Sequence, residues 1–211
     1  TNDKIVVFGS NGMAGSAICR ALKKKGYERI LRPLRNELNL LNYSEVFKWF
    51  KVHKPDVVVI AAAKVGGIYA NSTYPADFIY ENLMIQNNVI DAAYRAGIQR
   101  LMFLGSSCIY PKFADQPIHE CALLTGSLEP TNEAYAIAKI AGIKMCESYN
   151  YQYKTNYKCL MPTNTFGPND NYDTLNSHFF PSLIKKIHNL KNKKIKNLII
   201  WGDGSPKREV I

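Results

Sequence analysis

Few features of this sequence point to a membrane, to export or to a fold held together by disulfides. No segment approaches about 18 uninterrupted apolar residues, the length that spans a bilayer. The opening stretch, TNDKIVVFGS, enters a strand-like pattern at once, without the charged leader and apolar core of an export signal. The five cysteines are odd in number and include no CxxC pair, so neither a disulfide framework nor a zinc or other metal site is expected. These absences favour a cytoplasmic protein with no membrane partner.

Negative charge is also scarce. The chain carries 27 Lys and Arg against 17 Asp and Glu, a formal net charge of +10. Several of the lysines gather between Lys185 and Lys196, but no aromatic residue is interleaved with them. No helix-turn-helix, RNA-recognition or zinc-finger signature occurs elsewhere, so no nucleic-acid partner is expected. A basic balance also suits polyanionic small molecules such as nucleotides.

The chain does contain a regular alternation of short aliphatic runs and helical patterns. The aliphatic runs, which resemble buried parallel strands, lie at Lys4 to Phe8, Arg29 to Leu31, Asp56 to Ile60, Arg100 to Leu104 and Tyr157 to Met161. The helical patterns between them lie at about Gly12 to Lys25, Tyr43 to Val52, Pro75 to Ala96 and Asn132 to Tyr153. This alternation predicts an α/β fold built on a doubly wound, Rossmann-type parallel sheet.

The pattern changes after Pro168, where a polar loop leads into a helix from Phe179 to about Leu190 and then a strand from Asn197 to Trp201. We therefore expect two domains, a dinucleotide-binding domain over residues 1–166 and part of a smaller substrate-binding domain over residues 167–211. The second unit stops early, as though truncated. A short second lobe is the alternative.

The first predicted strand runs directly into a glycine-rich turn with the spacing GxxGxxG. Such glycines permit a tight turn and let the backbone approach a pyrophosphate, while the following helix offers free N–H groups. The residues expected to bind the dinucleotide here are Gly9, Ser10, Asn11, Gly12, Met13, Ala14 and Gly15. The alternative is a turn that is rich in glycine by chance. A Walker P-loop is excluded, because no GK[ST] follows.

The second predicted strand is followed by arginine where an NAD-binding site would carry an acid. The stretch LRPLR has no Asp or Glu before Glu37. Arginine suits the 2′-phosphate of NADP, which makes Arg35 the main candidate for that contact and Arg32 a second one. Either residue could instead be a plain surface cation.

Residues 131 to 139, TNEAYAIAK, place Tyr135 and Lys139 four positions apart and so on one face of a helix. A nearby ammonium favours a phenolate, so Lys139 is expected to lower the pKa of Tyr135 and make it a plausible general acid. The alternative is a polar edge on an ordinary helix. Upstream, Ser106 and Cys108 follow the fourth strand at the carboxyl edge, where ligands bind in such sheets.

Together these motifs resemble the extended short-chain dehydrogenase/reductase family, whose signature is Tyr-x-x-x-Lys with an upstream serine beside a glycine-rich turn. The stretches LNLLN, AAAKVGGI, NSTYPADFIY, LGSSCIYP and PTNTFGPND are similar to members that act on a GDP-bound sugar. The resemblance implies an NADPH-dependent enzyme that epimerises C3 and C5 and reduces C4 of GDP-4-keto-6-deoxy-D-mannose.

The resemblance also implies catalytic roles. Ser106 would bind the 4-keto oxygen, Tyr135 would protonate it, and Lys139 would hold the nicotinamide ribose. Cys108 and His178 would be the base and the acid of the epimerisations. The plainer alternatives are a buried small hydrophobe for Cys108 and a surface residue for His178.

Further binding residues follow from the same resemblance. Contacts to the cofactor are implied for Leu104, Gly105, Lys139, Pro162, Thr163, Asn164, Thr165 and His178. Contacts to the GDP portion are implied for Lys186, Trp201 and Arg208, with a strand-end core residue as the alternative for Trp201. A homodimer through the helices at Pro75 to Ala96 and Asn132 to Tyr153 is also implied. Two other functions compete with this one. The chain could be another nucleotide-sugar epimerase or dehydratase, or a non-catalytic nucleotide-binding module.

Overall fold

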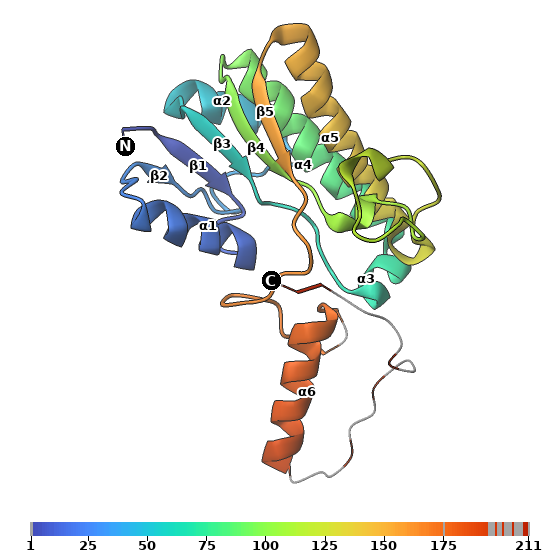
Figure 1. Cartoon of the computed structure of the whole chain (residues 1–211). Helices are drawn as coiled ribbons and strands as arrows, with labels where there is room; N and C mark the ends of the chain where they lie inside the picture. Colours follow the sequence, from blue (N-terminus) through green and yellow to red (C-terminus); the bar gives the residue numbers. More distant parts are fainter. Residues whose placement is uncertain are drawn as a thin grey trace.

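A five-stranded parallel sheet lies at the centre of the computed structural model (Figure 1), which describes residues 2–174, 176–193, 197, 200, 204 and 209–210. The strand order is β2-β1-β3-β4-β5. The strands are β1 (Ile5–Phe8), β2 (Ile30–Leu31), β3 (Val57–Ile60), β4 (Arg100–Leu104) and β5 (Asn156–Leu160). β1 is the point from which the order runs outward in both directions, as in a doubly wound sheet. The predicted fold class is confirmed.

Aliphatic side chains explain why the central strands form. All four residues of β1 are buried, and Val6 pairs in register with Val58 of β3, which pairs in turn with Leu101 of β4. Parallel strands covered on both faces read as continuous apolar runs, which is the pattern that the sequence shows.

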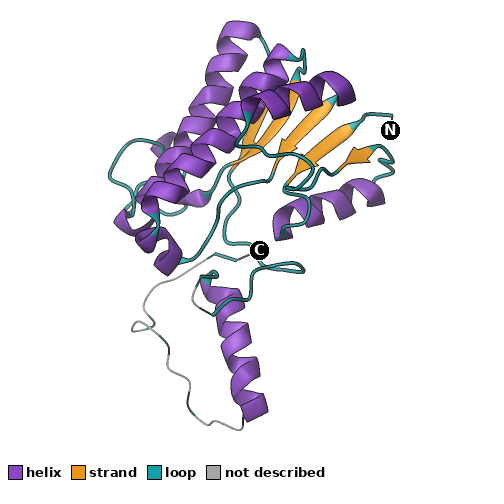
Figure 2. Cartoon of the chain, turned by 180° about the vertical axis from the view of Figure 1, so that it is seen from behind, coloured by secondary structure: helices purple, strands orange, loops and turns teal. Residues whose placement is uncertain are grey.

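Helices cover both faces of the sheet, as the two views show (Figures 1 and 2). On one face α1 (Met13–Lys24) packs Cys19 against Ile5, Val7 and Val59. On the other face α2 (Tyr43–His53), α4 (Pro75–Arg95) and α5 (Glu133–Tyr153) pack against the opposite side chains of the same strands. The larger core cluster lies on this second face. It includes Val6, Phe8 and Phe103.

One helix was not predicted. α3 (Ile68–Thr73) lies between the end of β3 and α4, in a stretch to which the sequence patterns assign no element. Tyr74 separates the two helices, because the residue before a proline is disfavoured in the helical region. Three short 3₁₀ turns, η1 (Ser107–Ile109), η2 (Glu120–Ala122) and η3 (Pro130–Asn132), were not predicted either.

After β5 the chain forms a long loop and then α6 (Phe179–Lys193), which extends away from the sheet (Figure 1). The strand expected at Asn197 to Trp201 lies largely outside the described residues. An isolated parallel bridge pairs Asn164 with Val210, which places residues 209 and 210 beside the loop after β5. In the part of the chain that the structure describes, no helix is long and apolar enough to cross a membrane.

Candidate active site

The glycine-rich turn connects β1 to α1 through a close backbone approach. Gly9 has φ +79°, a conformation that favours glycine, and a Cβ there would lie 2.6 Å from the backbone N of Ala62. A Cβ on Gly15 would lie 2.1 Å from the carbonyl O of Gly9. The first and last glycines of the motif are therefore required by the turn itself, which makes a chance enrichment of glycine the weaker interpretation.

The same turn has the properties of a phosphate site. Gly12 caps α1 without a side-chain hydrogen bond, and no acidic residue occupies the first turn of the helix. The hydroxyl oxygen of Ser10 is buried and has no hydrogen-bond partner among the described residues. An uncapped helix N-terminus with a buried free hydroxyl fits the pyrophosphate of a dinucleotide. Asn11 is exposed beside them.

A cavity of about 210 Å³ lies next to this turn. Met13, Ala14, Ala17 and Arg20 of α1 line one side, and residues 165–168 line the other. The structure thus brings Thr165 to the turn, as expected for two segments that bind one cofactor. Arg32 and Arg35 lie exposed after the end of β2, where a 2′-phosphate would be reached.

Tyr135 and Lys139 lie in the first turns of α5, one turn apart. The Nζ of Lys139 donates a hydrogen bond to the carbonyl O of Leu104 at 2.8 Å, which ties α5 to the end of β4. It also lies 5.7 Å from the ring centroid of Tyr135 and 4.7 Å from that of Phe103. Lys139 is 3% exposed. A buried ammonium without a carboxylate partner is costly, which is typical of a functional site.

Ser106 caps the 3₁₀ turn η1, which follows β4 closely, and Cys108 lies within that turn. The Oγ of Ser106 accepts a hydrogen bond from the backbone N–H of Cys108 at 3.4 Å. Gly105 donates its N–H to the carbonyl O of Leu160 at 2.7 Å, and Ser107 donates its N–H to that of Pro162 at 3.2 Å. The loop after β4 is therefore fixed against the loop after β5, and the hydroxyl of Ser106 interacts with both Cys108 and Tyr135.

The pKa of Tyr135 is shifted in the direction opposite to the one expected from the sequence. Burial raises the pKa of the Tyr135 phenol, the Cys108 charge raises it further, and Ser106 offsets this only in part. Burial likewise raises the pKa of the Cys108 thiol, against smaller lowering effects of Ser106 and Lys139. The expectation that the pKa of Tyr135 is lowered is wrong for this structure, because desolvation of the phenol is the largest effect. Burial lowers the pKa of Lys139 to about 8.

His178 lies immediately before α6 and is exposed. The surrounding protein still lowers the pKa of its imidazole by desolvation, while Asp170 raises it. The chain just before it is attached to the loop after β3, because the N–H of Gly67 donates a hydrogen bond to the carbonyl O of Asn176 at 2.8 Å. His178 is therefore tied to the carboxyl edge of the sheet through the loops after β3 and β5.

The remaining predicted residues are placed less favourably. The side chains of Thr163 and Asn164 donate hydrogen bonds to the carbonyl O of Glu209 at 3.2 and 3.0 Å. They hold the end of the described chain instead of standing free for a ligand. Lys186 is half-buried on α6. Trp201 and Arg208 lie outside the described residues.

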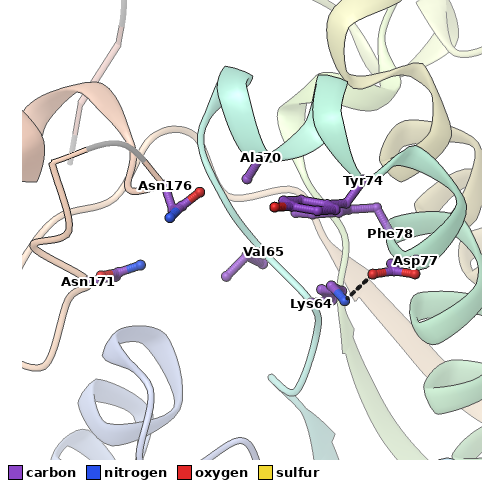
Figure 3. A pocket seen from close by; sticks show the side chains of 8 residues that line it. All are labelled: Lys64, Val65, Ala70, Tyr74, Asp77, Phe78, Asn171 and Asn176. Atoms are coloured by element: carbon purple, nitrogen blue, oxygen red, sulfur yellow. Dashed lines mark hydrogen bonds and ion pairs between the residues drawn. The ribbon is translucent and has the colours of Figure 1, made fainter.

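The sequence did not predict the ion pairs of Lys64. Its Nζ lies 2.6 Å from a carboxylate O of Glu81 and 3.2 Å from one of Asp77, both on α4. Lys64 and Asp77 border a cavity of about 370 Å³ that is also lined by Asn171 and Asn176 of the loop after β5 (Figure 3). The i, i+4 acids in YPADFIYE were the signal that a cation packs on this helix face.

The fold and the glycine-rich turn define a Rossmann-type, dinucleotide-binding α/β protein. The chain belongs to the NAD dependent epimerase/dehydratase family, whose family model matches residues 5–211. The resemblance to extended short-chain dehydrogenases/reductases is thereby confirmed.

Three similar proteins make the comparison specific. The chain is 51% identical to a GDP-L-fucose synthase of Escherichia coli K12 over 211 residues, which is 100% of this chain and 66% of that protein. A Campylobacter jejuni GDP-D-glycero-L-gluco-heptose synthase, solved in the presence of NADPH, is 37% identical with a TM-score of 0.90, covering 100% of this chain and 70% of the other. A Naegleria fowleri GDP-L-fucose synthetase bound to NADP is 26% identical with a TM-score of 0.87, covering 99% and 68%. The chain thus spans just under two thirds of the length of the E. coli relative.

Proposed function

We propose that this chain carries the cofactor-binding and catalytic part of an NADPH-dependent enzyme that converts GDP-4-keto-6-deoxy-D-mannose into GDP-L-fucose. The observation that carries the proposal is the meeting of Ser106, Cys108, Tyr135 and Lys139 at the carboxyl end of β4. A plain reductase needs the serine, the tyrosine and the lysine. A thiol that shares the same serine is an additional group, and it suits removal of a proton beside a ketone.

NADPH, when bound, supplies the hydride that C4 of the sugar receives. Tyr135 gives its phenolic proton to the 4-keto oxygen, and its raised pKa keeps it protonated at neutral pH. Ser106 donates a hydrogen bond to the same oxygen. Lys139 lies close enough to Tyr135 to stabilise the phenolate that remains. The turn from Gly9 to Gly15 holds the pyrophosphate.

Epimerisation uses the same oxygen-binding pair before the reduction. Protons at C3 and C5 are acidic because they flank the C4 ketone, and Ser106 and Tyr135 stabilise the enolate oxygen that forms. Cys108 removes the proton as a thiolate and becomes a thiol; because burial raises the pKa of this thiol, the thiolate is the minority form at neutral pH, and epimerisation should speed up as the pH rises. His178 returns a proton to the opposite face of the carbon as an imidazolium and becomes neutral; desolvation lowers the pKa of His178, so the imidazolium gives up its proton readily. One site therefore serves two epimerisations and one reduction.

Preference for NADP over NAD is a finer part of the proposal. Arg35 and Arg32 are exposed after β2, and no acidic residue stands there before Glu37. Arginine pairs well with a phosphate dianion, whereas an acid in that place would favour the free ribose hydroxyls of NAD. The Campylobacter structure was solved in the presence of NADPH and the Naegleria structure is bound to NADP, which supports the same preference.

We also propose the domain division near residue 167, with Lys186, Trp201 and Arg208 contacting the GDP portion. A homodimer through α4 and α5 is proposed as well, because these helices pack side by side and expose apolar side chains such as Tyr80 and Ile137. Light scattering of the purified protein tests the dimer. All five cysteines are free, which suits the reducing cytoplasm that we propose as its location.

A second candidate function is the same chemistry on a GDP-heptose, favoured by the similarity to the Campylobacter jejuni heptose synthase. The higher identity to the E. coli GDP-L-fucose synthase favours the first candidate. A non-catalytic binding module is disfavoured, because a binding role does not require the buried Lys139 beside Tyr135.

The epimerase part of the proposal is tested by Cys108→Ser. We expect incorporation of solvent deuterium at C3 and C5 to fall by about 10²-fold or more, because the base is lost. Binding of NADPH should be unchanged. Cys121→Ser, at an exposed thiol, is the matched control. Deuterium incorporation that is unchanged in Cys108→Ser would remove Cys108 as the base.

A further inference from the structure

The loop after β3 and the segment just before His178 meet at two glycines. Gly66 and Gly67 end the stretch AAAKVGG and lead into α3. The N–H of Gly67 donates a hydrogen bond to the carbonyl O of Asn176 at 2.8 Å. Figure 3 shows Asn176 opposite Val65 and Ala70, at the rim of the 370 Å³ cavity. His178 follows Asn176 by two residues.

This contact leaves no room for a side chain. A Cβ on Gly67 would lie 2.3 Å from the carbonyl O of Ser177 and 3.1 Å from its carbonyl carbon. Both neighbours are backbone atoms, so the whole segment would have to move. A Cβ on Gly66 would lie 3.1 Å from the Phe78 ring. Phe78 in turn packs its ring edgewise on Tyr135, with 6.4 Å between centroids. The glycine pair therefore lies against the segment that leads to His178 and against Phe78, which packs on Tyr135. His178 and Tyr135 are the two proposed acids.

Asn71 of α3 fixes the glycine pair from the other side. Its Nδ2 donates hydrogen bonds to the carbonyl O atoms of Gly66 at 2.8 Å and Gly67 at 3.0 Å. The side chain is buried, at 7% exposed. One amide thus orients two consecutive peptide groups, the first of which joins Gly66 to Gly67 and carries the Gly67 N–H.

The segment that carries His178 is held on its own side as well. Ser177 is buried, and its N–H donates to the carbonyl O of Asp173 at 3.3 Å. The Oγ of Ser182, on α6, donates to the carbonyl O of Thr174 at 3.1 Å. These hydrogen bonds make the segment around His178 a compact unit. The hydrogen bond from Gly67 to Asn176 therefore positions His178 as well as Asn176.

We propose that Gly67 and Asn71 are positioning residues that hold the Asn176–Ser177 segment against the sheet edge, so that His178 faces the sugar carbon deprotonated by Cys108. This inference rests on the proposed role of His178 as the acid of epimerisation. Neither residue touches the reacting atoms. They act through the backbone that places the imidazole.

The test compares Gly67→Ala with Ser72→Ala, at an exposed residue of α3 whose hydroxyl donates to carbonyl O atoms of its own helix. NMR titration of the His178 imidazole reports its surroundings without requiring any activity. We expect its pKa to rise towards the ordinary value in Gly67→Ala, because the segment withdraws from the protein. Deuterium incorporation at C3 and C5 should fall at least tenfold, and the Kd for NADPH should stay within twofold. Ser72→Ala should change none of these.

Asn71→Ala keeps the inference testable if Gly67→Ala does not fold, and it should shift both readouts in the same direction. An unchanged His178 titration in both variants would overturn the inference. An equal loss of NADPH binding and deuterium incorporation would also overturn it, because it would indicate general damage to the fold. If the unsubstituted protein incorporates no deuterium but His178 still shifts in Gly67→Ala, the proposed function fails and the positioning contact stands.

Discussion

Tyr135 and Lys139 show what local periodicity can and cannot predict. Their shared helix face follows from a spacing of four residues, and the structure confirms that they lie together. The direction of the Tyr135 pKa does not follow from spacing. It depends on how deeply the phenol is buried by residues far away in the sequence, such as Phe78, and on the smaller, opposing interaction with Ser106. Sequence patterns therefore predicted the pair but not its electrostatics.

Replacing Tyr135 with Phe tests its role as the acid of the reduction. We expect the rate of NADPH oxidation with the GDP-keto-sugar to fall by about 10²- to 10⁴-fold, the usual effect of losing a general acid. Deuterium exchange at C3 and C5 should fall less, because Ser106 still binds the enolate oxygen. Tyr151→Phe, on the same helix with a side chain that is 83% exposed, is the control and should change neither rate. Equal losses of both reactions in Tyr135→Phe would contradict the assignment.

Lys139 gives the reduction a pH dependence. Burial lowers its pKa to about 8, so the ammonium is present at neutral pH and is lost as the pH rises through that value. Since the charge stabilises the developing phenolate, kcat/KM for reduction should decline above about pH 8. The measurement is a pH profile between pH 6 and 10 with the cofactor at saturation. A rate that stays constant up to pH 10 would contradict this role of the ammonium.

At the scale of elements, the strands and long helices were predicted and the short connections were not. Aliphatic runs such as IVVF and VVVI are dictated by burial on both faces of the sheet, so sequence alone locates β1 and β3. α3 has six residues, too few to show a helical repeat, and it is held by tertiary contacts such as those of Asn71. The contact between Gly67 and Asn176 joins segments over 100 residues apart and has no local signal.

The helices α2, α4 and α5 are joined at the carboxylate of Asp91. It accepts hydrogen bonds from the hydroxyl of Tyr43 at 2.7 Å, the hydroxyl of Tyr149 at 2.8 Å and the Nε of Arg95 at 2.7 Å. Burial alone would raise the pKa of Asp91, but the hydrogen bonds from Tyr43, Arg95 and Tyr149 outweigh it and lower the pKa. Asp91 therefore contributes stability above the ordinary carboxyl pKa, and this stability is lost as the pH falls through the lowered value.

Asp91→Asn should destabilise the protein by about 1–3 kcal/mol at pH 7, because a charged acceptor of three hydrogen bonds is replaced. Thermal unfolding is the measurement, with a decrease in Tm of about 2–4 °C for each kcal/mol at this chain length. The difference from the unsubstituted protein should shrink near pH 3. Glu147→Gln, which removes only the exposed ion pair with Lys144, should have little effect. A Tm difference that is the same at pH 3 and pH 7 would contradict the account of Asp91.

At the scale of the whole molecule, the chemistry lies along one edge of the sheet. The glycine-rich turn follows β1, and the loop that contains Gly66 and Gly67 follows β3. Ser106 and Cys108 follow β4, and the loop that leads to His178 follows β5. Because all strands are parallel, their carboxyl ends meet at this edge, and residues from four distant parts of the sequence can share one ligand. The sequence motifs predicted that the functional residues lie at this edge. It could not place the residues after Lys193, which are mostly outside the described part of the chain.

The central claim is that one site both epimerises and reduces a GDP-keto-sugar. Supplying GDP-4-keto-6-deoxy-D-mannose and NADPH in deuterated water, with NADH in a parallel reaction, tests it most directly. The account predicts one NADPH oxidised per sugar, at least tenfold slower oxidation of NADH, and a product that carries deuterium at C3 and C5 but hydrogen at C4. Oxidation of NADPH without deuterium at C3 and C5, or deuterium incorporation without oxidation of NADPH, would contradict it.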